Sequence, residues 1–196
     1  MTLQPVTNVD EKQARILDAA VSVFAIYGYR RASMEDIARE AGMSRAALYQ
    51  YFRNKEDILV HGIQSYFDAT EIAMKQELTP GRNLFEALLL GCEAQAGEAA
   101  KMLFNSPHGA EFLSLKSAMP GDVSARGVAR IARVWADWLD EEAAAGRVAL
   151  PEGGAAEVAE AIVAGQHGQK EAARDYDDYR ARLRVFADLM ARALRP

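Results

Sequence analysis

Hydrophobic residues recur every three or four positions along most of the chain, which is the spacing of one face of an α-helix. The first such stretch ends at Gly28, a residue type that often closes helices, and its apolar positions are Ile16, Ala19, Ala20, Val23, Phe24 and Tyr27. No alternation of apolar and polar residues is long enough to predict a β-strand. The pattern therefore predicts an all-α protein of about nine helices.

Two short helices joined by a tight turn are expected next. Ser33 and Asp36 have the spacing of a capping box, in which a serine and an acid three residues later cap each other's backbone amides. Gly42 allows a sharp turn, and Ser44 is a suitable N-cap for the helix that follows. Asn54 is the expected N-cap of a fourth helix. This arrangement is typical of a helix-turn-helix.

The helix that starts after Ser44 has two different faces. At about 100° per residue, one face is mostly apolar and comprises Ser44, Ala47, Leu48, Tyr51 and Phe52. The other face comprises Arg45, Ala46, Tyr49 and Gln50. An arginine can pair with guanine, an amide with adenine, and a methyl group can contact thymine. We therefore predict that this is a recognition helix for DNA.

The segment from about Ala14 to Leu59 resembles the TetR family of bacterial transcriptional regulators. The motifs that carry the resemblance are Phe24…Gly28, Ser33-x-x-Asp36-Ile37-Ala38, Ala41-Gly42-Met43-Ser44, Leu48-Tyr49-x-Tyr51-Phe52 and Lys55-Glu56. The resemblance implies a helix-turn-helix DNA-binding domain followed by a helical domain for effector binding and dimerisation. A two-fold dimer would recognise a palindrome with half-sites about 34–36 Å apart.

The resemblance also assigns roles to single residues. Tyr49 and Lys55 match positions that contact phosphate, and Ser33 matches a cap close to the DNA backbone. Arg45, Ala46 and Gln50 occupy the positions that contact bases. With the N-cap Ser44, the predicted DNA-binding residues are Ser33, Ser44, Arg45, Ala46, Tyr49, Gln50 and Lys55. Ala47 stands where many members have a threonine or serine, so that additional DNA contact is not expected.

Charge is divided between two predicted domains, 1–55 and 56–196. The first has eight Lys/Arg and six Asp/Glu, and the second has 15 and 22, which gives net charges of +2 and −7. Residues 1–10 are expected to form a flexible arm. The cations expected near the recognition helix are Arg30, Arg31, Arg45, Arg53 and Lys55. The acidic second domain suits a cationic or neutral lipophilic ligand.

Other functional classes have little support in the sequence. The single cysteine, Cys92, excludes an intramolecular disulfide and suits the reducing cytoplasm. No apolar run approaches the roughly 18 residues of a membrane span. His61, His108 and His167 do not have metal-ligand spacing, and no catalytic motif is present. We therefore expect neither an enzyme nor a bound metal or cofactor.

The second domain is expected to be helical throughout. The expected helices cover about 54–77, 84–104, 109–118, 122–146, 155–170 and 176–194. The resemblance implies an effector pocket, for which the candidates are Phe85, Gln95, Met102, Phe104, His108, Phe112, Trp135, Trp138 and Gln166. Aromatic residues at helical spacing also suit a packed core, so both interpretations remain open for each of them.

The last two helices are candidates for a dimer interface. Small residues allow close approach on one helix, and an apolar stripe follows on the other; the candidates are Ala161, Gly165, Gly168, Leu183, Phe186 and Met190. The same stripe would serve an intramolecular helical hairpin. In the TetR family these helices usually form a four-helix bundle between two subunits.

These features predict a transcriptional regulator, most simply a homodimeric repressor that a small-molecule inducer releases from a palindromic operator. Three alternatives stay open: an activator, a regulator controlled by a protein partner, and an all-α ligand-binding protein without DNA binding. The operator and the identity of the effector are not encoded in any recognisable motif.

Overall fold

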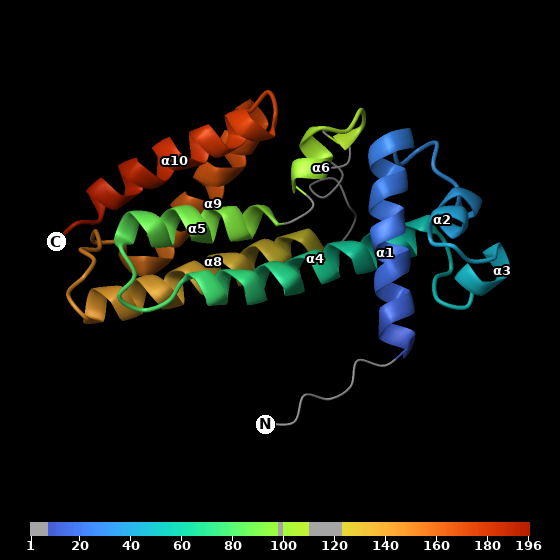
Figure 1. The fold of residues 1–196 in the computed structure, drawn as a ribbon. Helices are drawn as coiled ribbons and strands as arrows, with labels where there is room; N and C mark the ends of the chain where they lie inside the picture. Colours follow the sequence, from blue (N-terminus) through green and yellow to red (C-terminus); the bar gives the residue numbers. More distant parts are fainter. Residues whose placement is uncertain (1–7, 98–99, 110–122) are drawn as a thin grey trace.

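The computed structural model describes residues 8–97, 100–109 and 123–196 (Figure 1). These ranges contain nine α-helices and no strand, which confirms the all-α prediction. The helices are α1 (Asn8–Tyr27), α2 (Met34–Glu40), α3 (Arg45–Leu48), α4 (Lys55–Glu77), α5 (Leu84–Ala96), α6 (Ala100–Phe104), α8 (Val123–Ala144), α9 (Gly154–Ala172) and α10 (Tyr176–Ala193).

The structure corrects two expected boundaries. Helix α1 begins at Asn8, so the end of the expected arm 1–10 is helical. The single helix expected over 84–104 is two helices, because Gly97 has a positive φ of 79° and ends α5. A side chain rarely adopts that conformation, whereas glycine does so freely. The helix expected over 109–118 lies almost wholly outside the described residues.

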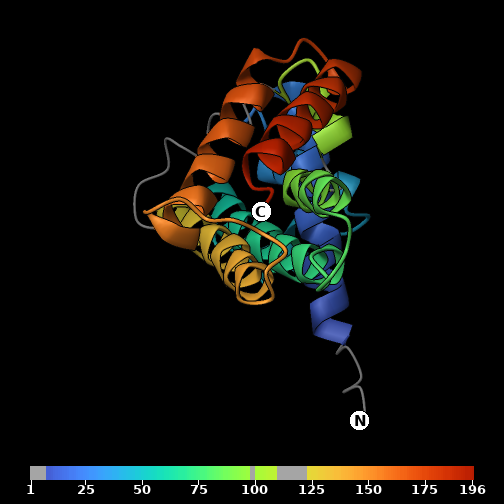
Figure 2. The same cartoon turned by 90° about the vertical axis from the view of Figure 1, so that its left-hand side faces the viewer.

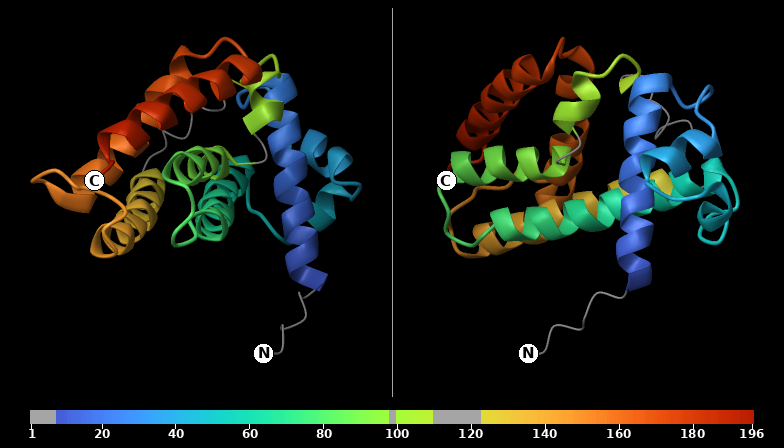
Figure 3. Two further views of the ribbon diagram at one scale, coloured as in Figure 1. Left: turned by 60° about the vertical axis from the view of Figure 1, so that its left-hand side comes forward. Right: turned by 45° about the vertical axis from the view of Figure 1, so that its right-hand side comes forward.

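Helix α4 joins the two ends of the molecule. Helix α1 crosses it, with α2 and α3 at the same end (Figure 1). Helices α4, α5 and α8 lie side by side, as the end-on view in Figure 2 shows. Helix α9 packs on α8, and α10 packs on both α5 and α9 (Figure 3). At about 1.5 Å per residue, the 23 residues of α4 span roughly 35 Å.

One continuous hydrophobic core connects both ends. It runs from Phe24 and Leu48 around the N-terminal helices, through Ile63 of α4, to Trp135 and Leu183. The N-terminal part therefore packs against α4 without an intervening linker. A ligand that moved α4 or α1 would act directly on the packing of the N-terminal helices.

Candidate nucleic-acid interface and ligand cavity

The turn between α2 and α3 forms as the local sequence predicts. The Ser33 hydroxyl accepts a hydrogen bond from the Asp36 amide at 3.2 Å, and the Asp36 carboxylate accepts one from the Ser33 amide at 3.1 Å. Gly42 has a φ of 65°, a left-handed conformation that suits glycine. The Ser44 hydroxyl then accepts from the Ala47 amide at 3.1 Å and caps α3.

The recognition helix has a buried side and an exposed side, but Ser44, which was predicted on the apolar face, is exposed. Leu48 and Phe52 are buried, and the helical turn continues beyond α3 because the Phe52 amide donates to the Leu48 carbonyl at 3.1 Å. The opposite face is exposed and consists of Arg45, Ala46, Tyr49 and Gln50. Ala47, on the other side, is partly buried. The solvent-exposed face is therefore the one that was expected to contact DNA.

Arg45 and Tyr49 lie together on that face. The Arg45 guanidinium is 3.4 Å from the Tyr49 hydroxyl, and its central carbon is 5.5 Å from the centre of the Tyr49 ring. Both side chains are exposed, and a contact of that length between exposed groups is weak. Either side chain can therefore leave the other to meet a base or a phosphate.

Lys55 has partners that the sequence did not indicate. Its ammonium group donates to the backbone carbonyls of Tyr29, Arg30 and Ala32 at 2.8, 3.0 and 3.1 Å. It also lies 4.7 Å from the centre of the Tyr29 ring. All three of its donors are thus engaged in holding the loop between α1 and α2. The phosphate contact implied by the resemblance stays a prediction and would require some of these bonds to break.

The other cations of this region differ in availability. Arg53 pairs with Asp57 at 3.1 Å, and Arg39 pairs with Asp36 at 2.6 Å. Arg30 and Arg31 are exposed, and neither side chain has an ion pair within the described part of the chain. Together with Arg45, they are the cations best placed for phosphate.

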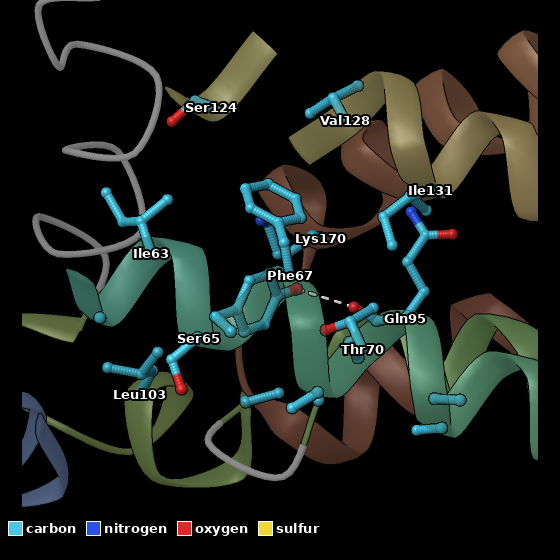
Figure 4. A pocket seen from close by; sticks show the side chains of 18 of the residues that line it. Ile63, Ser65, Phe67, Thr70, Gln95, Leu103, Ser124, Val128, Ile131 and Lys170 are labelled. Carbon is cyan, nitrogen blue, oxygen red and sulfur yellow. Dashed lines mark hydrogen bonds between the residues drawn. The ribbon is translucent and has the colours of Figure 1, made fainter. Parts of the chain in front are cut away.

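A cavity of about 1030 Å³ lies behind this region. Its walls come from α1, α4, the C-terminal end of α5, α6, α8, α9 and α10. Ile63, Phe67, Val128 and Ile131 form part of an apolar lining (Figure 4). The volume matches the upper end of the range for ligand pockets, roughly 300–1,000 Å³. The cavity is therefore large enough for a small organic molecule.

Polar side chains bridge the helices around the cavity. Gln95 accepts a hydrogen bond from the Trp135 indole at 2.8 Å, and its backbone carbonyl accepts one from the Tyr66 hydroxyl at 2.7 Å. Gln166 donates to the Cys92 carbonyl at 2.7 Å and to the Tyr179 hydroxyl at 3.1 Å. Burial raises the pKa of Tyr66 and of Tyr179, so both phenols stay protonated near neutrality.

The cavity contains three of the candidate pocket residues, Gln95, Phe104 and Gln166. Five others do not line it: Trp135 and Trp138 are buried in the core, Met102 is exposed, and Phe85 and His108 lie elsewhere. For Trp135 and Trp138 the structure favours the core interpretation that the sequence had left open, because helical spacing does not distinguish a side chain in the core from one in a pocket. Phe112 lies outside the described residues.

Several lining residues were not expected from the sequence, chiefly Leu17, Val21, Tyr66, Phe67, Thr70 and Lys170. The apolar positions of α1 and α4 follow a regular helical repeat, which looks the same whether the face meets a core or a cavity. Lys170 is a lysine near the C-terminal end of a helix, where that residue type is common for other reasons.

The candidate dimer residues differ in burial. Leu183 is fully buried within one chain, so it cannot contact a second copy in this conformation. Gly165 lies against the Phe186 ring, since a Cβ there would be 2.6 Å from it. Phe186 and Met190 are partly buried, whereas Ala161 and Gly168 are exposed. Val185 and Leu189 of α10, at 61% and 60% exposure, face outward in place of Leu183.

Within the described ranges, no helix is both long enough and apolar enough to cross a bilayer. The fold and the capped α2–α3 turn define an all-helical protein with an N-terminal helix-turn-helix. The sequence model of "Bacterial regulatory proteins, tetR family" matches residues 16–61. Residues 16–61 therefore resemble the DNA-binding region of the TetR family, and the fold of the chain is similar to that of a TetR regulator.

Known proteins resemble this chain in two ways. Over 49 residues it is 47% identical to the "Fatty acid metabolism regulator protein" of Bacillus subtilis, and over 69 residues it is 36% identical to the "HTH-type transcriptional activator FasR" of Mycolicibacterium smegmatis. These stretches span 25% and 35% of this chain, and only 25% and 32% of the two relatives.

The structural likeness extends over nearly the whole chain. A TetR transcriptional regulator from Streptomyces coelicolor superposes with a TM-score of 0.65 at 25% identity, over 94% of this chain and 98% of that one. SmeT, described as the repressor of a multidrug efflux pump of Stenotrophomonas maltophilia, superposes with a TM-score of 0.70 at 18% identity, over 94% and 90%. The second likeness shows a shared fold.

Proposed function

We propose that this protein is a DNA-binding transcriptional regulator whose affinity for a palindromic operator is controlled by a small molecule in the cavity. One observation carries the proposal: α4 begins at the helix-turn-helix and continues along the cavity. Lys55 at its first turn holds the loop after α1, and Ile63 and Phe67 line the cavity. Helix α1 also lines the cavity, through Leu17 and Val21.

The exposed face of the recognition helix supports the DNA-binding part of this proposal. Arg45, Tyr49 and Gln50 offer the donors that contact base edges and phosphates. The similarity in this region to proteins named as transcriptional regulators favours the same role. A protein of this kind meets its DNA in the cytoplasm, and a single free cysteine, Cys92, suits that reducing compartment.

A two-state mechanism connects the cavity to the DNA. A ligand that prefers one tilt of α4 would change the separation of the two recognition helices in a dimer. Operator affinity would then change by the difference in the ligand's affinity for the two states, and by no more. We place the dimer contact on the exposed sides of α9 and α10, which carry Ala161, Gly168, Val185 and Leu189.

The test of DNA binding uses the region upstream of the protein's own gene, at two salt concentrations. We expect saturable protection of a palindrome and weaker binding at higher salt. Replacing Arg45 with alanine should cost about 1–3 kcal/mol of binding free energy if it contacts a base. The matched control is Arg133→Ala, an exposed arginine of α8, which should leave affinity unchanged.

Binding no tighter than to random DNA across a genome-wide selection of fragments would contradict the proposal. An all-α ligand-binding protein without DNA binding would then be the better description. Equal affinity for Arg45→Ala and the unmodified protein, with no change in sequence preference, would instead show that Arg45 does not contact a base.

The proposed tilt of α4 is tested by measuring the distance between the two recognition helices of the dimer. A spin label on a cysteine introduced at the exposed Glu40 position would report the separation of the two helix-turn-helix regions in the dimer. Buried Cys92, with its raised pKa, should not react with the label. A ligand that weakens operator binding should change this distance, and an unchanged distance would rule out the tilt of α4 as the cause.

A further inference from the structure

One buried polar atom of the cavity lacks a partner. Gln166 is only 4% exposed, and its amide nitrogen is fixed by the Cys92 carbonyl and the Tyr179 hydroxyl. Its side-chain oxygen is buried and has no hydrogen-bond partner among the described residues. A buried acceptor without a donor is unfavourable, so a ligand hydroxyl or N–H group that reached this oxygen would stabilise it.

A cation lies one helical turn further along α9. Lys170 also lines the cavity, and it makes no hydrogen bond or ion pair with the residues that the structure describes. The acid that acts on it is its chain neighbour Glu171, which is 71% exposed and lies 3.3 Å from His167. Loss of hydration lowers the pKa of Lys170. A bound anion would stabilise the charged ammonium group.

The two groups are close enough to be reached by one head group. Residues four apart on a helix have Cβ atoms about 5–6 Å apart and share a face. The space beside them is apolar, with Ile63 and Phe67 of α4 and Val128 of α8 around it (Figure 4). The polar end of a ligand would therefore bind at α9, and its apolar part would lie along α4.

The acids around the cavity do not favour a cation to the same degree. Asp18 and Glu160 are exposed, so water screens their attraction for a ligand. Glu93 is already paired with Arg180 at 3.0 Å. The net charge of the C-terminal part suggests a cationic or neutral ligand, whereas the residues that line the cavity favour an anionic ligand.

We propose that the cavity binds a lipophilic acid with a hydroxyl or N–H group close to its carboxylate. The carboxylate pairs with Lys170, the hydroxyl or N–H donates to the Gln166 side-chain oxygen, and the apolar tail packs on Ile63 and Phe67. This inference rests on the proposed function, since it names the class of effector for the same cavity.

Calorimetry on the full chain tests the inference with four probes that each carry a ten-carbon chain, all below their micelle concentrations. They are 3-hydroxydecanoate, decanoate, decanamide and decyltrimethylammonium. We expect affinity to fall in that order, because the first satisfies both groups and the last repels Lys170. Lys170→Met should weaken both carboxylates by about tenfold or more and should leave decanamide nearly unchanged. Lys101→Met, an exposed lysine outside the cavity, is the matched control and should change nothing.

Three results would overturn the inference: no binding of any probe, binding of decanamide or decyltrimethylammonium as tight as that of decanoate, or carboxylate binding that survives Lys170→Met. Equal affinity for decanoate and 3-hydroxydecanoate would remove the role of Gln166. These outcomes are distinct from failure of the proposed function. A protein that binds its operator but prefers no carboxylate loses only this inference, whereas one that prefers carboxylates but binds no DNA loses the regulator role.

Discussion

At the N-terminus of α4, the Lys55 ammonium group occupies the centre of a ring of backbone carbonyls from Tyr29, Arg30 and Ala32. A residue in this position fixes the loop that leads into α2, because each bond to a charged donor is strong and directional. It also joins α4 to the helix-turn-helix. We infer that Lys55 orients the helix-turn-helix whether or not it also contacts phosphate.

Substituting Lys55 with methionine should therefore act on the fold. We expect the free energy of unfolding to fall by about 1.5–3 kcal/mol and operator affinity to fall with it. The slope of log K against log salt should stay the same, since no cation is withdrawn from the phosphates. A slope that becomes shallower by about 0.9 would show instead that Lys55 neutralises one phosphate. Lys75→Met, on the same helix and paired with Glu71 at 2.6 Å, should cost less than about 0.5 kcal/mol.

At the scale of single elements, the caps decide where helices begin. Asn54 caps α4 through the Asp57 amide at 2.8 Å, and Asp175 caps α10 through the Asp178 amide at 2.8 Å. The Asp178 carboxylate in turn accepts the Arg174 amide at 3.0 Å and the Arg182 guanidinium at 3.1 Å. These bonds lower the pKa of Asp178 to about 2 from 3.8.

The lowered pKa predicts a pH dependence for α10. Because the folded carboxylate has the lower pKa, its stabilising contribution is complete above the unfolded value of 3.8 and is lost as the pH falls through about 2. Melting temperatures measured from neutral pH into this acid range should fall less for Asp178→Asn than for the unmodified protein. Parallel curves for the two proteins would show that Asp178 does not contribute in this way.

Two glycines inside helices, one closely packed and one not, test the packing of α5 on α8. A Cβ at Gly91 of α5 would lie 2.4 Å from Trp135, which is fully buried and bonded to Gln95. A Cβ at Gly62 of α4 would meet only Leu17, at 4.0 Å. Gly91→Ala should destabilise the protein by about 1–3 kcal/mol through overpacking. Gly62→Ala should stabilise it by about 0.5–1 kcal/mol, as alanine does within a helix. Chemical denaturation measures both, and a stable Gly91→Ala protein would contradict the packing of α5 on α8.

At the scale of the whole molecule, α9 and α10 leave an apolar surface uncovered. Val185 and Leu189 are one turn apart on α10 and more than half exposed. Exposed apolar residues at helical spacing favour contact with a second helix surface. The small exposed residues Ala161 and Gly168 of α9 would allow such a surface to approach closely.

Replacing Leu189 with glutamate should therefore convert a dimer into monomers without loss of helix content. Sedimentation velocity would measure the mass, and circular dichroism would confirm the fold. Ile72→Glu is the control, because Ile72 is equally exposed, at 61%, but lies on α4. A Leu189→Glu protein that stays dimeric, or an unmodified protein that is monomeric, would exclude this interface.

Much of the N-terminal region was predictable because its structure depends on near neighbours. The capping box at Ser33, the turn at Gly42 and the cap at Ser44 each involve residues within four positions of one another. The two faces of the recognition helix follow from helical periodicity alone. The break at Gly97 is also local, but a glycine inside a helical pattern indicates a break only when its φ is known.

Local sequence thus determined the helices, the helix-turn-helix and its exposed face. Which apolar stripe packs on another helix and which lines the cavity depends on the tertiary fold. In the folded chain Leu183 is buried and Leu189 is exposed. Phe67 of α4 and Lys170 of α9 line the same cavity, and Lys55 donates to backbone carbonyls after α1. The physical reason is that helical periodicity fixes the direction of a side chain relative to its own helix axis. The surface that this side chain then contacts is formed by residues far away in the chain.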